Sequence, residues 1–134
     1  VYEGGLGGFD ALRGVGFAIG RVTRDEAELL SLGVAPPWRG RRIGAALLRA
    51  AMARSYEAGA SLMFLEVAVD NTAAQRLYAA HGFEIVGLRP DYYQRADGSR
   101  VGAHTMRCEL DRVFASGGPA IVGAPLNAAA GPAS

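Results

Sequence analysis

Apolar residues fall in blocks along the chain that predict five strands and two helices. Mostly apolar stretches at residues 15–22 and 28–34 are typical of strands. Apolar residues then recur at helical spacing from 43 to 50, which predicts a helix that ends before Gly59. A parallel crossover between the strands on either side of this helix follows from that order, and such crossovers are right-handed.

The second half of the chain repeats this pattern on a shorter scale. Residues 62–69 are almost continuously apolar, which indicates a central strand covered on both faces. Asn71 can cap a short helix that closes near Gly82, and two further strands are expected at 83–88 and 101–110. The order predicts a mixed α/β (α+β) fold with a mostly antiparallel sheet and flanking helices.

The two ends differ from this central part. Residues 1–13 are rich in glycine and suggest a hairpin tip or a frayed entry. We expect the domain to occupy residues 1–112 and an Ala/Gly/Pro-rich tail, 113–134, to be disordered, because residues 115–134 carry no charge and few large apolar groups.

Composition narrows the possible chemistry. The 134 residues are 50% hydrophobic and 20% charged, which suits one domain with a core. The net charge of +1 creates no overall positive potential that would attract nucleic acid. All 14 basic residues are Arg, which excludes a lysine nucleophile and a Walker-type phosphate loop. One Cys and two His cannot form a structural zinc site, so we expect no metal. We also expect no membrane contact and a cytoplasmic location, because no apolar run approaches the ~20 residues of a membrane span and the lone Cys suits a reducing compartment.

An arginine- and glycine-rich loop precedes the longer helix. Its cations oppose the helix dipole unless an anion sits at the same helix start, and its glycines would let a phosphate approach the main chain. A solvated basic turn is the alternative. The loop and the first helical residues are Arg39, Gly40, Arg41, Arg42, Ile43, Gly44 and Ala45.

Three polar residues follow in the second half. Glu66 interrupts the apolar run at 62–69, where lost hydration suits a carboxylate to accept a proton as a general base; it can instead point outward or pair with an arginine. Asn71 and Tyr78 are two helical turns apart and can face one cleft, although a helix cap and a core aromatic explain them equally well.

Together these stretches resemble the GNAT family of acetyl-CoA-dependent N-acetyltransferases. The family's pyrophosphate motif, Q/R-x-x-G-x-G/A, is similar to residues 39–44, with Arg42 at the usual middle glycine. The segments 65–67, 70–74, 77–78 and 82–83 look closest to the branch that acetylates the N-terminal alanine of a ribosomal protein. Domains of the family normally begin with a strand and two helices, and we expect residues 1–14 to lack counterparts of these elements.

The resemblance implies a role for each candidate residue. Glu66 matches the proton acceptor and Tyr78 the proton donor to the leaving thiolate. The main chain of Leu32, Gly33 and Val34, the loop at 39–45 and Asn71 match contacts to acetyl-CoA. The implied partner is an acceptor protein N-terminus. A small-molecule amine acceptor and a catalytically silent acyl-CoA-binding module are the alternatives.

Overall fold

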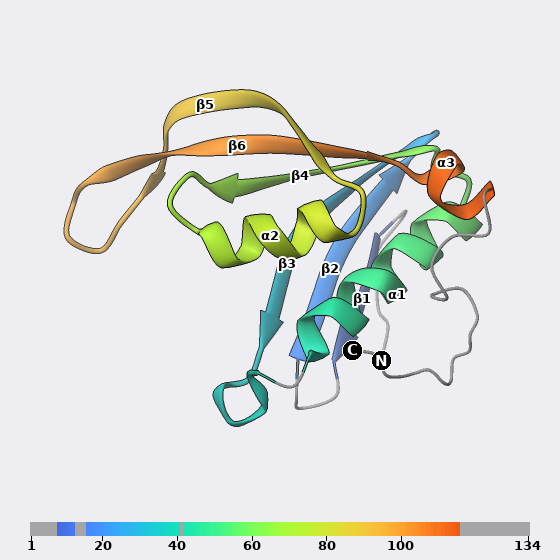
Figure 1. Ribbon diagram of the computed structural model, residues 1–134, viewed down its shortest axis with the longest axis horizontal. Coiled ribbons are helices and arrows are strands. Elements are labelled where there is room, and N and C mark those ends of the chain that lie inside the picture. Colours follow the sequence, from blue (N-terminus) through green and yellow to red (C-terminus); the bar gives the residue numbers. More distant parts are fainter. Residues whose placement is uncertain (1–7, 13–15, 41, 116–134) are drawn as a thin grey trace.

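The computed structural model describes residues 8–12, 16–40 and 42–115 as a single six-stranded sheet with helices packed against it (Figure 1). The strands lie in the order β1-β2-β3-β4-β6-β5. All neighbours pair antiparallel except β3 and β4, so the predicted mixed and mostly antiparallel sheet is confirmed. The strands are β1 (Gly8–Leu12), β2 (Gly16–Thr23), β3 (Glu26–Val34), β4 (Leu62–Ala68), β5 (Glu84–Gln94) and β6 (Arg100–Glu109).

Three helices and a 3₁₀ turn connect these strands. The turn η1 (Pro36–Trp38) follows β3, and α1 (Ile43–Glu57) makes the crossover to β4. The helix α2 (Thr72–Ala80) begins at Asn71, whose side chain accepts a hydrogen bond from the Ala74 N–H at 3.1 Å. The short helix α3 (Leu110–Ala115) follows β6.

The core lies between one face of the sheet and the helices. Alternate residues of β4, Met63, Leu65 and Val67, are buried against α1 and α2, while the residues between them are only partly buried. The expectation that both faces of this strand are covered is therefore wrong for the described residues.

The structure corrects three sequence-based boundaries. Residues 8–12 form a strand where a hairpin tip or frayed entry was expected, and the other glycine-rich residues before them lie outside the described part. The strand expected at 83–88 continues to Gln94, so Tyr92 and Tyr93 lie in β5 and not in a loop. The expected tail begins inside α3, where Val113 and Phe114 pack on the core, and 116–134 lie outside the described residues.

Candidate functional site

The strands β3 and β4 pair only over their first three residues. Residues Glu26–Glu28 lie beside Leu62–Phe64, and beyond that point the two strands diverge (Figure 1). A β-bulge helps to redirect β3, because Ile19 pairs with Ser31 and Gly20 with Leu29, which leaves Leu30 without a partner. The edge of β3 from Leu29 to Val34 therefore has no strand partner toward β4, and its main-chain groups can bind another molecule.

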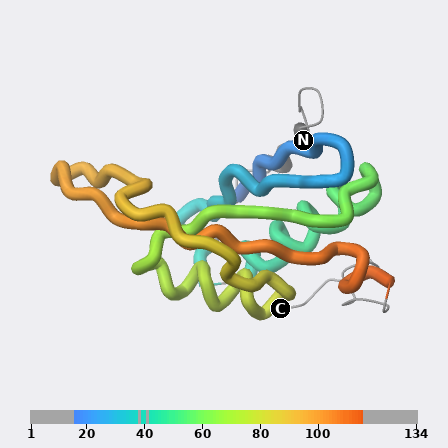
Figure 2. Tube along the Cα trace, turned by 90° about the horizontal axis from the view of Figure 1, so that it is seen from above, coloured from blue at the N-terminus to red at the C-terminus, as the bar shows by residue number. Residues whose placement is uncertain are grey.

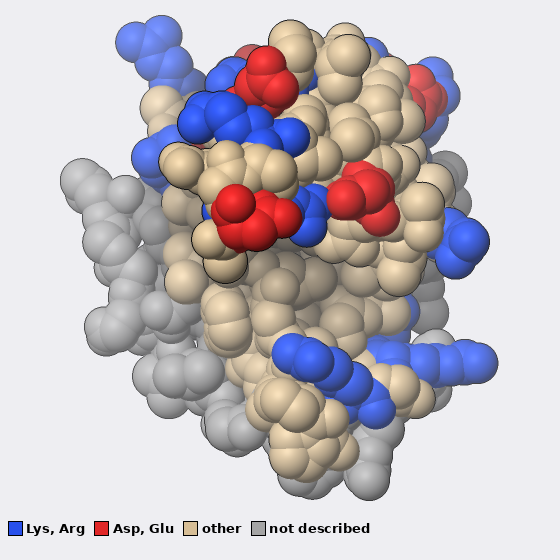
Figure 3. Space-filling view, turned by 90° about the vertical axis from the view of Figure 1, so that its left-hand side faces the viewer, with Lys and Arg blue, Asp and Glu red and all other residues tan. Residues whose placement is uncertain are grey.

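A cavity of about 570 Å³ opens where the strands separate. Figure 3 shows the molecule hollowed between the β5–β6 hairpin above and the loop after β3 below, which carries basic side chains. The lining residues come from β3, β4, α2 and the hairpin; among them are Leu32, Glu66, Asn71, Tyr78, Tyr93 and Arg95. The three polar residues selected from the second half of the sequence, Glu66, Asn71 and Tyr78, thus line one cavity.

The Glu66 carboxylate is asymmetrically bound. Its Oε2 atom accepts a hydrogen bond from the Thr105 hydroxyl at 3.0 Å and lies 2.8 Å from the Arg89 Nε. Its Oε1 atom is buried and has no hydrogen-bond partner within 3.5 Å among the described residues. The side chain is 15% exposed, so a buried acceptor oxygen remains available to a donor that enters the cavity.

Tyr78 brings a phenol to the same cavity from α2. Its ring packs edge-on against Phe83 at 5.9 Å between centroids. Burial, and then the nearby Tyr93, raise the pKa of the Tyr78 phenol above its usual value of 10.0. The phenol therefore stays protonated near neutral pH and can donate its proton to a strongly basic group.

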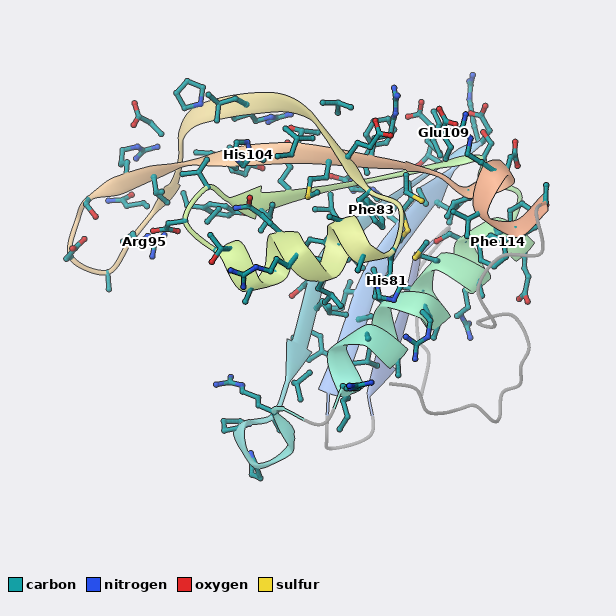
Figure 4. All side chains as sticks on the ribbon, viewed as in Figure 1. His81, Phe83, Arg95, His104, Glu109 and Phe114 are labelled. Carbon is teal, nitrogen blue, oxygen red and sulfur yellow. The ribbon has the colours of Figure 1, made fainter. Side chains whose placement is uncertain are left out.

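The β5–β6 hairpin closes the side of the cavity. Its tip extends beyond the body of the molecule (Figure 2). The Tyr93 hydroxyl donates to the Glu66 carbonyl oxygen at 3.3 Å, and Arg95, labelled in Figure 4, lies 2.7 Å from Asp70. Glu66 also raises the pKa of the Tyr92 phenol, first by side-chain hydrogen bonding and then by its negative charge.

The arginine- and glycine-rich loop leads from β3 into α1. Gly40 has φ +81° and Arg42 has φ 61°, both in the left-handed region. The Arg39 Nε donates to the Val34 carbonyl oxygen at 3.0 Å, which ties the loop to the end of β3. Arg41 lies outside the described residues. The first N–H groups of α1 are left without helical partners, as an anion site at a helix start requires.

Two glycines in the segments predicted to bind acetyl-CoA differ in how far packing requires them. A Cβ at Gly33 would lie 2.6 Å from the Phe17 ring, so this glycine is required by packing. A Cβ at Gly44 would lie 3.8 Å from a Leu77 methyl and 3.9 Å from a Val34 methyl, which is ordinary contact. The packing therefore does not require glycine at position 44, which lies close to the end of β3 and to α2.

The candidate residues divide into two adjoining groups. The cavity lining includes Leu32, Glu66, Asn71 and Tyr78. A second group does not line it and lies around the start of α1: Gly33, Val34, Arg39, Gly40, Arg42, Ile43, Gly44 and Ala45. The two groups adjoin at Gly44, where an added Cβ would meet Leu77 and Val34. Sequence reasoning did not select Thr105 or Arg89; the possibility that Glu66 pairs with an arginine was the signal available for Arg89.

A second cavity, of about 520 Å³, opens at the side of Glu66 away from Tyr78. Arg21, Glu28, Phe64, Arg89 and Thr105 are among its lining residues, and Glu66 lines both cavities. Glu28 and Arg21 form an ion pair in it at 2.6 Å. Glu66 therefore lies at the border between the two cavities.

Two other kinds of site are absent from the described residues. Within residues 8–12, 16–40 and 42–115, no group of three or more His, Cys, Asp or Glu side chains is placed to hold a metal ion. None of the helices described is both long and apolar enough to cross a bilayer.

Comparison with known proteins gives consistent matches. A sequence model of the acetyltransferase (GNAT) family matches residues 7–83. The chain is 38% identical over 96 residues to the [ribosomal protein bS18]-alanine N-acetyltransferase of Haemophilus ducreyi, covering 72% of this chain and 66% of that protein. It is 42% identical over 97 residues to the N-alpha-acetyltransferase RimI of Mycobacterium tuberculosis, covering 69% of this chain and 58% of that protein.

A solved structure supports the same relationship. The crystal structure of the ribosomal-protein-S18-alanine N-acetyltransferase from Escherichia coli superposes with a TM-score of 0.69 at 32% identity, covering 81% of this chain and 69% of that chain. The chain thus spans roughly three fifths to two thirds of the curated relatives above.

Proposed function

This chain belongs to the GNAT acetyltransferase family, and from that premise we propose that it transfers an acetyl group from acetyl-CoA to the α-amine of a protein N-terminus. The observation that carries the proposal is the cavity between β3 and β4, which is lined by Glu66, whose carboxylate keeps one oxygen without a partner among the described residues, and by Tyr78, whose phenol stays protonated. An amine and a thioester need these two groups for direct transfer.

Glu66 is the base in this proposal. An incoming ammonium gives a proton to Oε1, directly or through one water, and the resulting amine attacks the thioester carbonyl carbon. Oε2 stays bound to Thr105 and Arg89 during this step. The second cavity, which also reaches Glu66, gives the amine a route separate from that of the thioester.

Tyr78 is the acid. When the tetrahedral intermediate collapses, the carbon–sulfur bond breaks and the thiolate takes the phenolic proton. Main-chain N–H near Val34, on the free edge of β3, stabilises the oxyanion before that collapse. The only cysteine, Cys108, is buried, and burial raises the pKa of its thiol to about 11, so an acyl-cysteine intermediate has no support.

The start of α1 holds the diphosphate of acetyl-CoA. Unpartnered N–H groups there, with Arg39 and Arg42 at the loop, supply charge and hydrogen bonds for an anion. The absence of a side chain at Gly44 lets a phosphate reach the main chain. Asn71, which caps α2 and lines the cavity, contacts the coenzyme as well.

The leading acceptor is the N-terminal alanine of a small-subunit ribosomal protein, because the relatives at 38% and 32% identity carry names that state this acceptor. Such an acceptor places the reaction in the cytoplasm. The arrangement at Glu66 and Tyr78 would serve any primary amine, so acceptor choice needs its own test.

That test measures thiol release from acetyl-CoA with three acceptors. They are a peptide with the alanine N-terminus of ribosomal protein S18, the same peptide with a blocked N-terminus, and spermidine. We expect turnover with the first alone and, by mass spectrometry, one acetyl group on its α-nitrogen. Turnover with spermidine alone would instead indicate a small-amine enzyme. Calorimetric binding of acetyl-CoA without turnover on any acceptor would indicate a silent binding module.

A further inference from the structure

A large bulge in β5 lies directly beside Glu66. Arg89 pairs with Ala103 and Tyr93 with Val101, so three residues of β5, 90–92, face the single residue Gly102 of β6. Asp91 has φ 56°, and a Cβ at Gly102 would lie 3.1 Å from the Arg89 carbonyl oxygen. The bulge therefore brings two backbone segments close together at Gly102, where an added Cβ would make a tight contact.

The bulge brings three β5 side chains toward one residue of β4. Arg89 reaches Oε2 of Glu66, and Tyr93 reaches the main-chain carbonyl of the same residue. Tyr92 lies between them: its ring is 5.2 Å from the Arg89 guanidinium carbon and contacts the Tyr93 ring edge-on at 5.0 Å. A regular strand would have turned one of these neighbouring side chains to the opposite face.

The two carboxylate oxygens of Glu66 are consequently unequal. Arg89 and Thr105 bind Oε2 from β5 and β6 and fix the plane of the carboxylate. Oε1 is left buried and unpartnered within 3.5 Å among the described residues. A freely rotating carboxylate would present either oxygen to a donor, whereas this one presents a single oxygen in a fixed direction.

We propose that Arg89 is a positioning residue for acetyl transfer, which binds Oε2 of Glu66 so that Oε1 alone faces the acceptor amine. This inference rests on the proposed role of Glu66 as the base. In the step concerned, a proton passes from the acceptor nitrogen to Oε1, and Arg89 keeps its own protons throughout. Tyr92 supports the guanidinium from the side of its aromatic face.

Because Arg89 is exposed, its positioning role can be tested separately from any contribution to the stability of the fold. The Arg89 side chain is 59% exposed and that of Glu66 is 15% exposed, so water screens the pair from the arginine side and its loss should cost the fold a limited amount of stability. Loss of Arg89 should therefore leave the protein folded, with the carboxylate held at Oε2 by Thr105 alone. Arg112 provides a matched control, because it forms an exposed ion pair with Glu109 at 3.5 Å on another part of the surface.

The experiment compares the wild-type chain with Arg89→Ala, Arg89→Lys, Glu66→Gln and Arg112→Ala. We expect Arg89→Ala to lower kcat by about 10- to 100-fold while KM for acetyl-CoA stays nearly constant. Arg89→Lys should recover only part of kcat, because an ammonium lacks the planar donor geometry. Added millimolar guanidinium should raise kcat of Arg89→Ala and should not raise kcat of Glu66→Gln. Arg112→Ala should match the wild type.

A wild-type kcat for Arg89→Ala, beside a slow Glu66→Gln, would overturn the positioning role and leave the proposed function standing. Absence of transfer by the wild type would instead count against the proposed function. Nuclear magnetic resonance of protein carrying ¹³C in the glutamate carboxyls then decides the positioning role alone. The Glu66 signal should move in Arg89→Ala and not in Arg112→Ala; an unmoved signal would show that Arg89 does not hold the carboxylate.

Discussion

Arg42 has a backbone conformation that suits glycine better than arginine. Its φ of 61° and ψ of 21° lie in the left-handed region, at the residue that caps α1. A residue with a Cβ loses roughly 1–2 kcal/mol there relative to glycine. The resemblance places a glycine of the family motif at this position, so the chain carries an additional charge next to the proposed diphosphate site at the cost of local strain.

Replacing Arg42 with glycine should therefore separate stability from binding. We expect Arg42→Gly to raise the free energy of unfolding by up to about 1 kcal/mol, because relief of strain exceeds the added entropy of the unfolded chain. Affinity for acetyl-CoA should fall, and fall more at low salt than at high salt. Urea unfolding and calorimetry measure the two effects.

Replacing Gly40 with alanine is the opposite change, because it adds a side chain in the left-handed region. The φ of Gly40 is +81°, and apart from its chain neighbours no atom of the described residues lies within 4 Å of the Cβ it lacks, so Gly40→Ala adds strain without a clash there. It should lower the free energy of unfolding by about 1–2 kcal/mol. If Arg42→Gly and Gly40→Ala changed stability in the same direction, strain in the loop would not explain either result.

At the scale of elements, the start of α1 meets the end of β3 and one face of α2. Gly44 is the second residue of α1, and an added methyl group there makes only ordinary contacts at 3.8 and 3.9 Å. Alanine is favoured over glycine inside helices by roughly 0.5–1 kcal/mol. Packing and helix propensity thus give no reason for glycine at this position, whereas a ligand that approaches the main chain does.

Gly44→Ala should consequently stabilise the free protein by a few tenths of a kcal/mol, up to about 1, and weaken acetyl-CoA binding. Gly33→Ala is the comparison: its Cβ would lie 2.6 Å from Phe17, so it should destabilise the fold by about 1–3 kcal/mol. Melting curves with and without acetyl-CoA distinguish the two. Unchanged affinity in Gly44→Ala would contradict a diphosphate site at this helix start.

Sequence patterns predicted the elements with strong local signals and missed those set by tertiary contacts. The helical spacing at 43–50 and the cap at Asn71 are local, and both helices are present. The strand expected at 83–88 ends before Pro90, yet β5 continues to Gln94, because a bulge opposite Gly102 accommodates the proline. The strand at 8–12 depends on pairing with β2, which its glycine-rich sequence does not indicate.

The candidate site was predicted in part for the same reason. Glu66 interrupts an apolar run, and Tyr78 shares a helix with Asn71, so both were found by pattern. The order of residues does not show that Thr105 and Arg89 meet one oxygen of Glu66, since the register of three strands decides this contact. The alternative that Glu66 pairs with an arginine is correct, and it coexists with an unpartnered second oxygen.

For the molecule as a whole, a buried thiol makes the free energy of unfolding decrease at alkaline pH. Cys108 has no exposed surface, and its pKa is raised from 9.0 to about 11, chiefly by burial. The folded state retains the thiol proton between these values while the unfolded state loses it. Stability is therefore complete below about pH 9 and falls as the pH rises toward 11.

This loss should amount to about 2–3 kcal/mol between about pH 8 and pH 11. Cys108→Ala should show a smaller decrease over the same interval, whatever its stability at neutral pH. Urea unfolding at the two pH values measures both decreases, and their difference removes the contribution of tyrosines such as Tyr78. Equal decreases in the two proteins would show that the thiol is not responsible.

Direct acetyl transfer by this chain requires that one cavity between two diverging strands contain both the acid and the base. The direct measurement is kcat/KM for the alanine-initiated peptide with Glu66→Gln and Tyr78→Phe, with Tyr56→Phe as a control, because Tyr56 stacks on Phe114 and does not line the cavity. We predict losses of about 10²–10⁴-fold for the first two variants and none for the control. Near-wild-type kcat/KM in both folded variants would contradict the account.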